Sequence, residues 1–150
     1  FKDFKKMTFP SQGGDGRLYL NWRAGPFSEE AFSAMFLSDG MLRFLCMLAI
    51  FRCPTPPPLI VVEEPELGLH PDLIRLVASL VKEASSRTQL IVTTHSPDLV
   101  SELEPEDVLI VEKADGATEM RRLSGPNLEI WLKEFRLGEL WQMGEIGGRP

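Results

Sequence analysis

Two adjacent carboxylates, Glu63 and Glu64, have the residue types and spacing to do chemistry. They follow the apolar run 59–62, which predicts a short buried strand of a parallel sheet. Ligands of open α/β sheets bind beyond the carboxyl ends of strands, and successive side chains leave a strand on opposite sides. One carboxylate could therefore hold Mg²⁺, usually through its water shell, while the other orients or deprotonates an attacking water. Such a pair is the acidic half of a nucleotide hydrolase site, although adjacent acids also occur as solvated groups in loops.

His95 is a second candidate because it follows the segment 89–94, QLIVTT, which also predicts a buried strand. Ser96 and Pro97 come next and are typical of a helix cap and a first helical residue. A single histidine is more often structural. At a strand end beside the acidic strand, however, its imidazole could hydrogen-bond a γ-phosphate or the attacking water. His70 precedes a proline at another predicted helix start, where we expect a capping or loop role.

The start of the helix predicted over 37–52 offers a third candidate, formed by Ser38, Asp39, Gly40 and Met41. Ser38 or Asp39 could simply cap the first turn. Alternatively, the free N–H groups of this turn could bind a phosphate, and Gly40 would let that phosphate approach the backbone closely. The acid at position 39 would oppose an anion there.

A phosphate-binding loop of the form G-x-x-x-x-G-K-[ST] does not occur in the 150 residues. The glycine cluster 13–16 is followed by Arg17 and a strand-like stretch, so it predicts a hairpin turn. Any nucleotide chemistry would therefore need a partner segment to grip the phosphates.

Strand and helix patterns alternate along the chain and predict an α/β fold with a largely parallel sheet flanked by helices. The helix that starts at Pro71 has apolar residues at a spacing of three and four, which predicts one buried stripe. This stripe comprises Leu73, Leu76, Val77, Leu80, Val81 and Ala84. The remaining predicted elements are strands over 17–22, 108–111 and 119–123, and amphipathic segments around Trp131 and over 137–141.

Composition is ordinary for one globular domain, with 43% hydrophobic and 25% charged residues. The net charge of −6 argues against a surface that is basic all over, but a local basic face remains possible. No apolar run is long enough to span a bilayer.

Cys46 and Cys53 are expected to be buried free thiols in a reducing cytoplasm. The start at Phe1 hints at a piece of a longer polypeptide.

These candidates, in this order, resemble the C-terminal half of an ABC-type ATPase head. The likeness is strongest to the branch with RecF-like, SMC-like and OLD-like proteins and related predicted AAA-type ATPases. The likeness rests on four segments: a signature-like motif at 37–43, a Walker B strand with a following glutamate at 59–64, a D-loop at 67–71 and a switch-histidine loop at 94–96. The run 63–71, EEPELGLHP, is very specific to that branch.

The resemblance implies ATP and Mg²⁺ as cofactors, with Glu64 and His95 as catalytic residues and Glu63 at the metal. Glu63 departs from the usual Asp by one methylene, which leaves metal contact expected but its geometry open. Walker A belongs to the missing N-terminal half in this family. The chain would then be a single partial domain, with N-terminal strands over 1–36, a core over 37–123 and a tail over 124–150.

The resemblance also implies a head-to-head dimer. In such dimers Ser38, Asp39, Gly40 and Met41 would contact the γ-phosphate held by the other head. The expected partners are therefore the half that carries Walker A, a second ATPase head and possibly DNA, with no membrane. By analogy, the expected setting is DNA repair, maintenance or anti-phage defence in the cytoplasm.

Two alternatives stay open at this point. One is a regulatory or dimerisation module that kept the fold without catalysis, for which the absent phosphate-binding loop argues. The other is a metal-dependent nuclease that uses Glu63, Glu64 and Glu66. The nuclease is less favoured for two reasons. A two-metal site needs several converging acids, whereas this chain has one acidic strand end. The sequence also has no basic or aromatic stripe to bind a nucleic acid.

Overall fold

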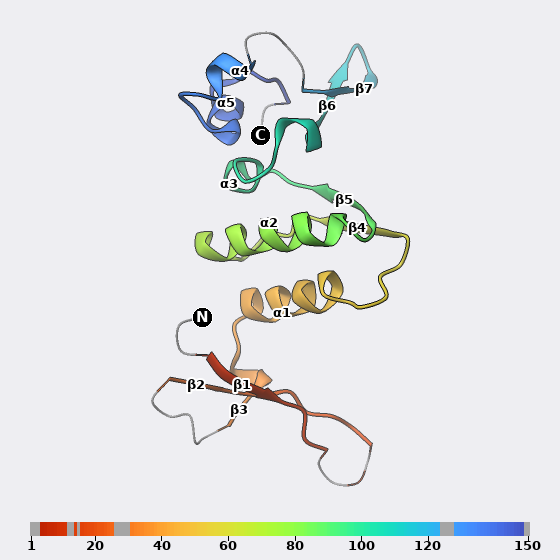
Figure 1. Cartoon of the computed structure of the whole chain (residues 1–150), viewed down its shortest axis with the longest axis vertical. Helices are drawn as coiled ribbons and strands as arrows, with labels where there is room; N and C mark the ends of the chain where they lie inside the picture. The colour runs from red at the N-terminus through yellow and green to blue at the C-terminus, as the bar shows by residue number, and fades with distance from the viewer. Residues whose placement is uncertain (1–3, 12–13, 15, 26–30, 124–127, 149–150) are drawn as a thin grey trace. The chain divides into compact units, whose positions relative to one another are not determined.

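The computed structural model describes residues 4–11, 14, 16–25, 31–123 and 128–148 (Figure 1). The chain forms two compact units, Phe1–Arg43 and Phe44–Pro150, and each is described by itself. The subdivision expected at 36/37 and 123/124 stays a prediction.

The unit Phe1–Arg43 contains an antiparallel sheet with the order β1-β2-β3, and a short 3-10 helix follows it. These elements are β1 (Phe4–Thr8), β2 (Asn21–Ala24), β3 (Phe32–Ser33) and η2 (Ala34–Phe36). The strand expected over 17–22 begins later, and Leu18 forms only an isolated bridge with Ser11. That bridge frames the expected hairpin turn, in which Gly14 and Gly16 have positive φ. Gly13 and Asp15 lie outside the described residues.

A parallel pair of strands forms the centre of the unit Phe44–Pro150. β4 (Leu59–Glu63) and β5 (Gln89–Thr93) pair in register from Leu59↔Gln89 to Glu63↔Thr93. The helix α2 (Pro71–Ser85) makes the crossover between them (Figure 1). The α/β class is thus confirmed, with a parallel sheet smaller than expected.

The strands predicted over 108–111 and 119–123 form a separate antiparallel hairpin. They are β6 (Leu109–Ala114) and β7 (Ala117–Arg122). Asp115 and Gly116 connect them with φ of 50° and 83°. Two consecutive positive φ angles at Asp-Gly are typical of the tight turn that joins antiparallel strands, so this dipeptide was a readable signal for the hairpin.

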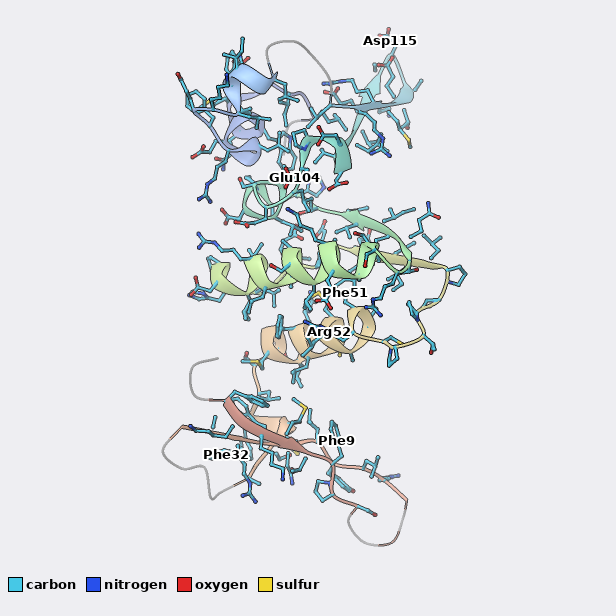
Figure 2. The ribbon with its side chains drawn as sticks, viewed as in Figure 1. Phe9, Phe32, Phe51, Arg52, Glu104 and Asp115 are labelled. Carbon is cyan, nitrogen blue, oxygen red and sulfur yellow. The ribbon has the colours of Figure 1, made fainter. Side chains whose placement is uncertain are left out.

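The main core of the unit Phe44–Pro150 is formed by side chains of α1 (Asp39–Phe51), of α2 and of the inner face of the β4–β5 pair. It comprises Phe44, Met47, Phe51, Ile60, Val77, Leu80 and Ala84, and Phe51 is labelled in Figure 2. Two expectations need correction. Leu76 lies outside the buried stripe of α2 and is 44% exposed, whereas Ile74 and Ala78 are buried. Cys46 is free but exposed, because it lies on the face of α1 away from this core.

A second core cluster surrounds the C-terminal helices and includes Val100, Ile110, Leu137, Leu140, Trp141 and Ile146. Its residues come largely from α3 (Pro97–Val100), β6, α4 (Leu128–Trp131) and α5 (Leu137–Met143). The short 3-10 helix η3 (Pro105–Asp107) precedes β6 in sequence. The indole N–H of Trp141 donates to the carbonyl of Gly148. Across the part of the chain that the structure describes, no helix combines the length and apolarity needed to cross a membrane.

The start of α5 packs closely against α3. The backbone N–H of Gly138 donates to Ser101 Oγ at 3.2 Å. A Cβ at position 138 would lie 1.9 Å from the carbonyl oxygen of Pro97. Only glycine therefore allows these two helices to pack this closely.

The substitution Gly138→Ala is expected to lower the free energy of unfolding by about 2 kcal/mol, because backbone must move to make room for the methyl group. Urea denaturation of the chain measures this change. Met143→Ala, at a side chain 53% exposed on the same helix, is the control and should change the value by less than ~0.5 kcal/mol. Equal stability of Gly138→Ala and the unsubstituted chain would contradict the observed packing.

Candidate functional site

The in-register pairing of β4 and β5 brings the predicted strand-end residues to one edge of the sheet. The paired strands end at Glu63 and Thr93. The N–H of Glu64 donates to the carbonyl of Thr93 at 2.9 Å, which extends the ladder by one bond. Glu64 and His95 therefore lie one and two residues beyond the paired ends. Glu63 and His95 are exposed and Glu64 is half-buried, so the edge is open to a ligand.

The backbone at Glu64 is strained. Its φ of 44° lies in the left-handed region, which costs an L-residue with a side chain roughly 1–2 kcal/mol. The turn that follows is closed by hydrogen bonds from Leu67 N to Glu64 O and from Leu69 N to Glu66 O, at 3.1 and 3.0 Å. Strain of this kind clusters at functional sites, where the surrounding structure holds it in place.

Glu66 connects this acidic turn to the loop that carries His95. Its Oε1 accepts hydrogen bonds from Thr94 Oγ1 at 2.5 Å and from the N–H of His95 at 3.2 Å. Its Oε2 is buried and has no hydrogen-bond partner among the residues that the structure describes. From sequence, Glu66 is a candidate only as a nuclease acid, and no local pattern signals this bridging role.

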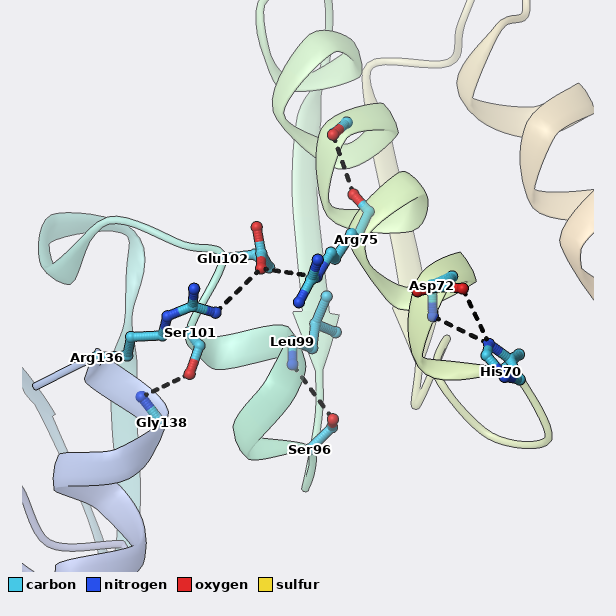
Figure 3. Close-up of polar contacts among 10 residues, drawn as sticks. His70, Asp72, Arg75, Ser96, Leu99, Ser101, Glu102, Arg136 and Gly138 are labelled. Carbon is cyan, nitrogen blue, oxygen red and sulfur yellow. Dashed lines mark hydrogen bonds and ion pairs between the residues drawn. The ribbon is translucent and has the colours of Figure 1, made fainter. Parts of the chain in front are cut away.

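The loop after β5 is organised by two local hydrogen bonds. Thr94 Oγ1 accepts from the N–H of Ser96 at 2.9 Å, and Ser96 Oγ accepts from the N–H of Leu99 at 3.2 Å. Figure 3 shows the second bond, which confirms Ser96 as the cap of α3. The loop is thus fixed on both sides of His95 while the imidazole stays exposed.

His70 has the expected capping role. Its Nδ1 accepts a hydrogen bond from the N–H of Asp72 at 3.3 Å, at the first turn of α2 (Figure 3). The same figure shows Glu102 between Arg75 and Arg136, with N···O distances of 3.7 and 4.0 Å. Such partly solvated ion pairs contribute little to stability. We assign no catalytic role to the His70 cap or to the ion pairs of Glu102.

The residues expected to contact a phosphate in trans begin α1 and belong to the unit Phe1–Arg43. Ser38 Oγ accepts from the N–H of Met41 at 3.3 Å, so Ser38 rather than Asp39 caps the first turn. Ser38 and Asp39 are exposed and Gly40 is half-buried. Their role toward a phosphate stays a prediction.

Glu63 has the donor chemistry that Mg²⁺ prefers. Mg²⁺ keeps several waters and takes one or two carboxylates together with substrate phosphates. An exposed carboxylate at a strand end fits that requirement without a cage of protein ligands. Within the described ranges, no three His, Cys, Asp or Glu side chains are placed to hold a metal ion together.

The fold is similar to that of solved SMC ATPase heads. One is a structure described under ATP-driven dimerization and DNA-stimulated activation of SMC ATPases, with a TM-score of 0.65 and 19% identity over 86% of this chain. Another is an SMC head bound to the C-winged helix domain of ScpA, with a TM-score of 0.64 and 22% identity over 85% of this chain. A third, from Pyrococcus yayanosii, has a TM-score of 0.60 and 22% identity over 86%. The present chain spans 80%, 39% and 25% of these three chains.

No curated protein is significantly similar to this chain in sequence. One family model does match, with the description "AAA domain, putative AbiEii toxin, Type IV TA system", over residues 23–101. The matched segment contains the start of α1, both strand ends and the loop after β5. Since it covers 79 of the 150 residues, the chain belongs to this AAA-domain family, and its fold is that of an ABC- and SMC-like ATPase head fragment.

Proposed function

We propose that this chain is half of an ABC-type ATPase head that binds and hydrolyses ATP with Mg²⁺. The observation that carries the proposal is the position of Glu63, Glu64 and His95 at or just beyond the adjoining ends of two parallel strands. This edge is where ligands of α/β sheets bind. Membership of an AAA-domain family and the SMC-head fold support a nucleotide as that ligand.

Each strand-end residue has a distinct role in the proposed reaction. Glu64 accepts a proton from, or orients, the water that attacks the γ-phosphate. The exposed imidazole of His95 donates a hydrogen bond to the γ-phosphate or its water. Glu63 would hold Mg²⁺, which when bound neutralises charge on the transferred phosphoryl group. Catalysis is then mainly positioning and charge stabilisation, as in phosphoryl transfer generally.

The phosphate-binding loop must come from an N-terminal part of the polypeptide or from a partner. An uncovered apolar surface supports the need for such a segment. On the face of the β4–β5 pair opposite the core, Leu59, Val61 and Ile91 are 44%, 61% and 47% exposed. Parallel sheets are normally covered on both faces, and here, among the described residues, only the inner face of the pair packs against helices. We assign this face to the half that carries Walker A.

A second head completes the proposed assembly. The first turn of α1, with Ser38, Asp39, Gly40 and Met41, would contact the γ-phosphate bound by that head, so ATP would join the two heads and hydrolysis would release them. One structurally similar SMC ATPase is described under ATP-driven dimerization and DNA-stimulated activation. The description of the matching family names a toxin system. Both are compatible with a cytoplasmic role in DNA repair, DNA maintenance or anti-phage defence.

The isolated chain is expected to show no micromolar binding of ATP in isothermal titration calorimetry, with or without Mg²⁺. The reason is that a single helix start and a strand-end carboxylate do not replace the backbone cradle of a phosphate-binding loop. Tight binding by the chain alone would show that the phosphates are held by residues within it and would overturn the proposed division between two halves.

In the ATPase completed by its phosphate-binding half, Glu64→Gln is expected to lower kcat by about 10²–10⁴ while ATP binding persists, because the amide cannot act as a base. Steady-state phosphate release and nucleotide binding measure the two quantities. Glu119→Gln, at an exposed acid on β7, is the control and should behave like the unsubstituted enzyme. Unchanged turnover in Glu64→Gln would remove Glu64 from the role of base.

A further inference from the structure

Glu66 is a carboxylate that the proposed reaction does not use directly. It lies two residues after Glu64, in the turn that leaves β4, and it reaches residues 28 and 29 positions away in sequence. Both of its hydrogen bonds end on one oxygen, Oε1, and both come from the loop that leaves β5. One atom therefore links the two segments that carry the proposed base and the proposed phosphate sensor.

The bonds made by Glu66 act on the backbone and on the anchor of the His95 loop. The N–H of His95 itself donates to Oε1 at 3.2 Å. The hydroxyl of Thr94 donates a hydrogen bond to the same oxygen and accepts one from the N–H of Ser96. The conformation of residues 94–96 therefore depends on Glu66. Hydrogen bonds to an ionised acceptor are stronger and shorter than neutral ones, which suits a fixed spacing between two loops.

Stability alone does not explain a glutamate at this position. The second oxygen, Oε2, is buried and makes no hydrogen bond to any residue in the described part of the chain. A buried polar atom without a partner is destabilising, and such groups are rare in native proteins unless they have a role. The strained backbone of Glu64, two residues earlier, is a second destabilising feature of the same turn.

We infer that Glu66 is a positioning residue that holds the His95 loop against the Glu64 turn, so that base and phosphate sensor keep a fixed spacing. This inference rests on the proposed function for its catalytic consequence, but the linkage itself is a property of this chain. In this assignment Glu66 acts through the backbone of His95 and through Thr94, to which it is hydrogen-bonded.

Amide hydrogen exchange in the 150-residue chain tests the linkage without any nucleotide. Glu66→Ala removes both hydrogen bonds and is expected to speed exchange at the His95 amide roughly 10- to 100-fold, the loss expected for a bond to a charged acceptor. Glu66→Gln keeps an acceptor oxygen and should stay within about fivefold of the unsubstituted chain. Glu104→Ala is the matched control, because it removes an exposed carboxylate whose hydrogen bond is to Lys82. Glu104 is labelled in Figure 2. This control should leave the His95 amide unchanged.

Two exchange results would overturn the inference. One is an unchanged His95 amide in Glu66→Ala. The other is faster exchange by the same factor throughout the unit Phe44–Pro150, which would mean that Glu66 only stabilises the fold.

ATP turnover by the completed ATPase tests the catalytic consequence. Glu66→Ala is expected to lower kcat at least tenfold with the KM for ATP within about threefold, and Glu66→Gln to restore most of the rate. A loosened His95 loop with unchanged kcat would overturn the positioning role. Absence of turnover in the unsubstituted assembly would instead remove the proposed function, and the exchange ratios would still decide whether Glu66 holds the loop.

Discussion

The parallel, in-register pairing of β4 with β5 is the constraint on which the rest of the site depends. Parallel strands end at the same edge of a sheet, so the register Glu63↔Thr93 fixes where the acids and the histidine can meet. The additional bond from Glu64 N to Thr93 O carries this pairing into the turn. A slip of one residue would turn each side chain of β4 to the opposite face and expose Ile60, which belongs to the main core. Burial of the core and geometry of the site are therefore set by the same register.

Much of this arrangement could be predicted from sequence because its causes are local. The apolar run before Glu63, the proline after His70 and the Ser96-Pro97 pair each specify an element or a boundary through well-understood backbone preferences. The structure has a strand, a helix start and a helix cap at these positions, but only one face of the strand is buried rather than both. The rotation of α2 was less well predicted. Leucine at position 76 fits a helical stripe by spacing, yet the core that forms on α2 selects Ile74 and Ala78.

The features that sequence did not predict depend on contacts between distant segments. The bond from Thr94 to Glu66 joins residues 28 apart, and no periodicity or motif spacing encodes a contact of that kind. The close packing of Gly138 on Pro97 is similar, since it requires knowledge of how α5 lies on α3. The hairpin of β6 and β7 differs from both, because the Asp-Gly turn was present as a local signal.

In the proposed reaction, Glu64 and His95 act together on the terminal phosphoryl group of a nucleotide held by a partner segment. A high-resolution structure of the completed ATPase head with a non-hydrolysable ATP analogue and Mg²⁺ tests it most directly. We expect the Glu64 carboxylate to lie within hydrogen-bond reach, about 3 Å, of a water placed to attack the γ-phosphate. The His95 imidazole should lie within similar reach of that phosphate or its water. A nucleotide bound away from the ends of β4 and β5, or either side chain pointing away from the γ-phosphate, would contradict it.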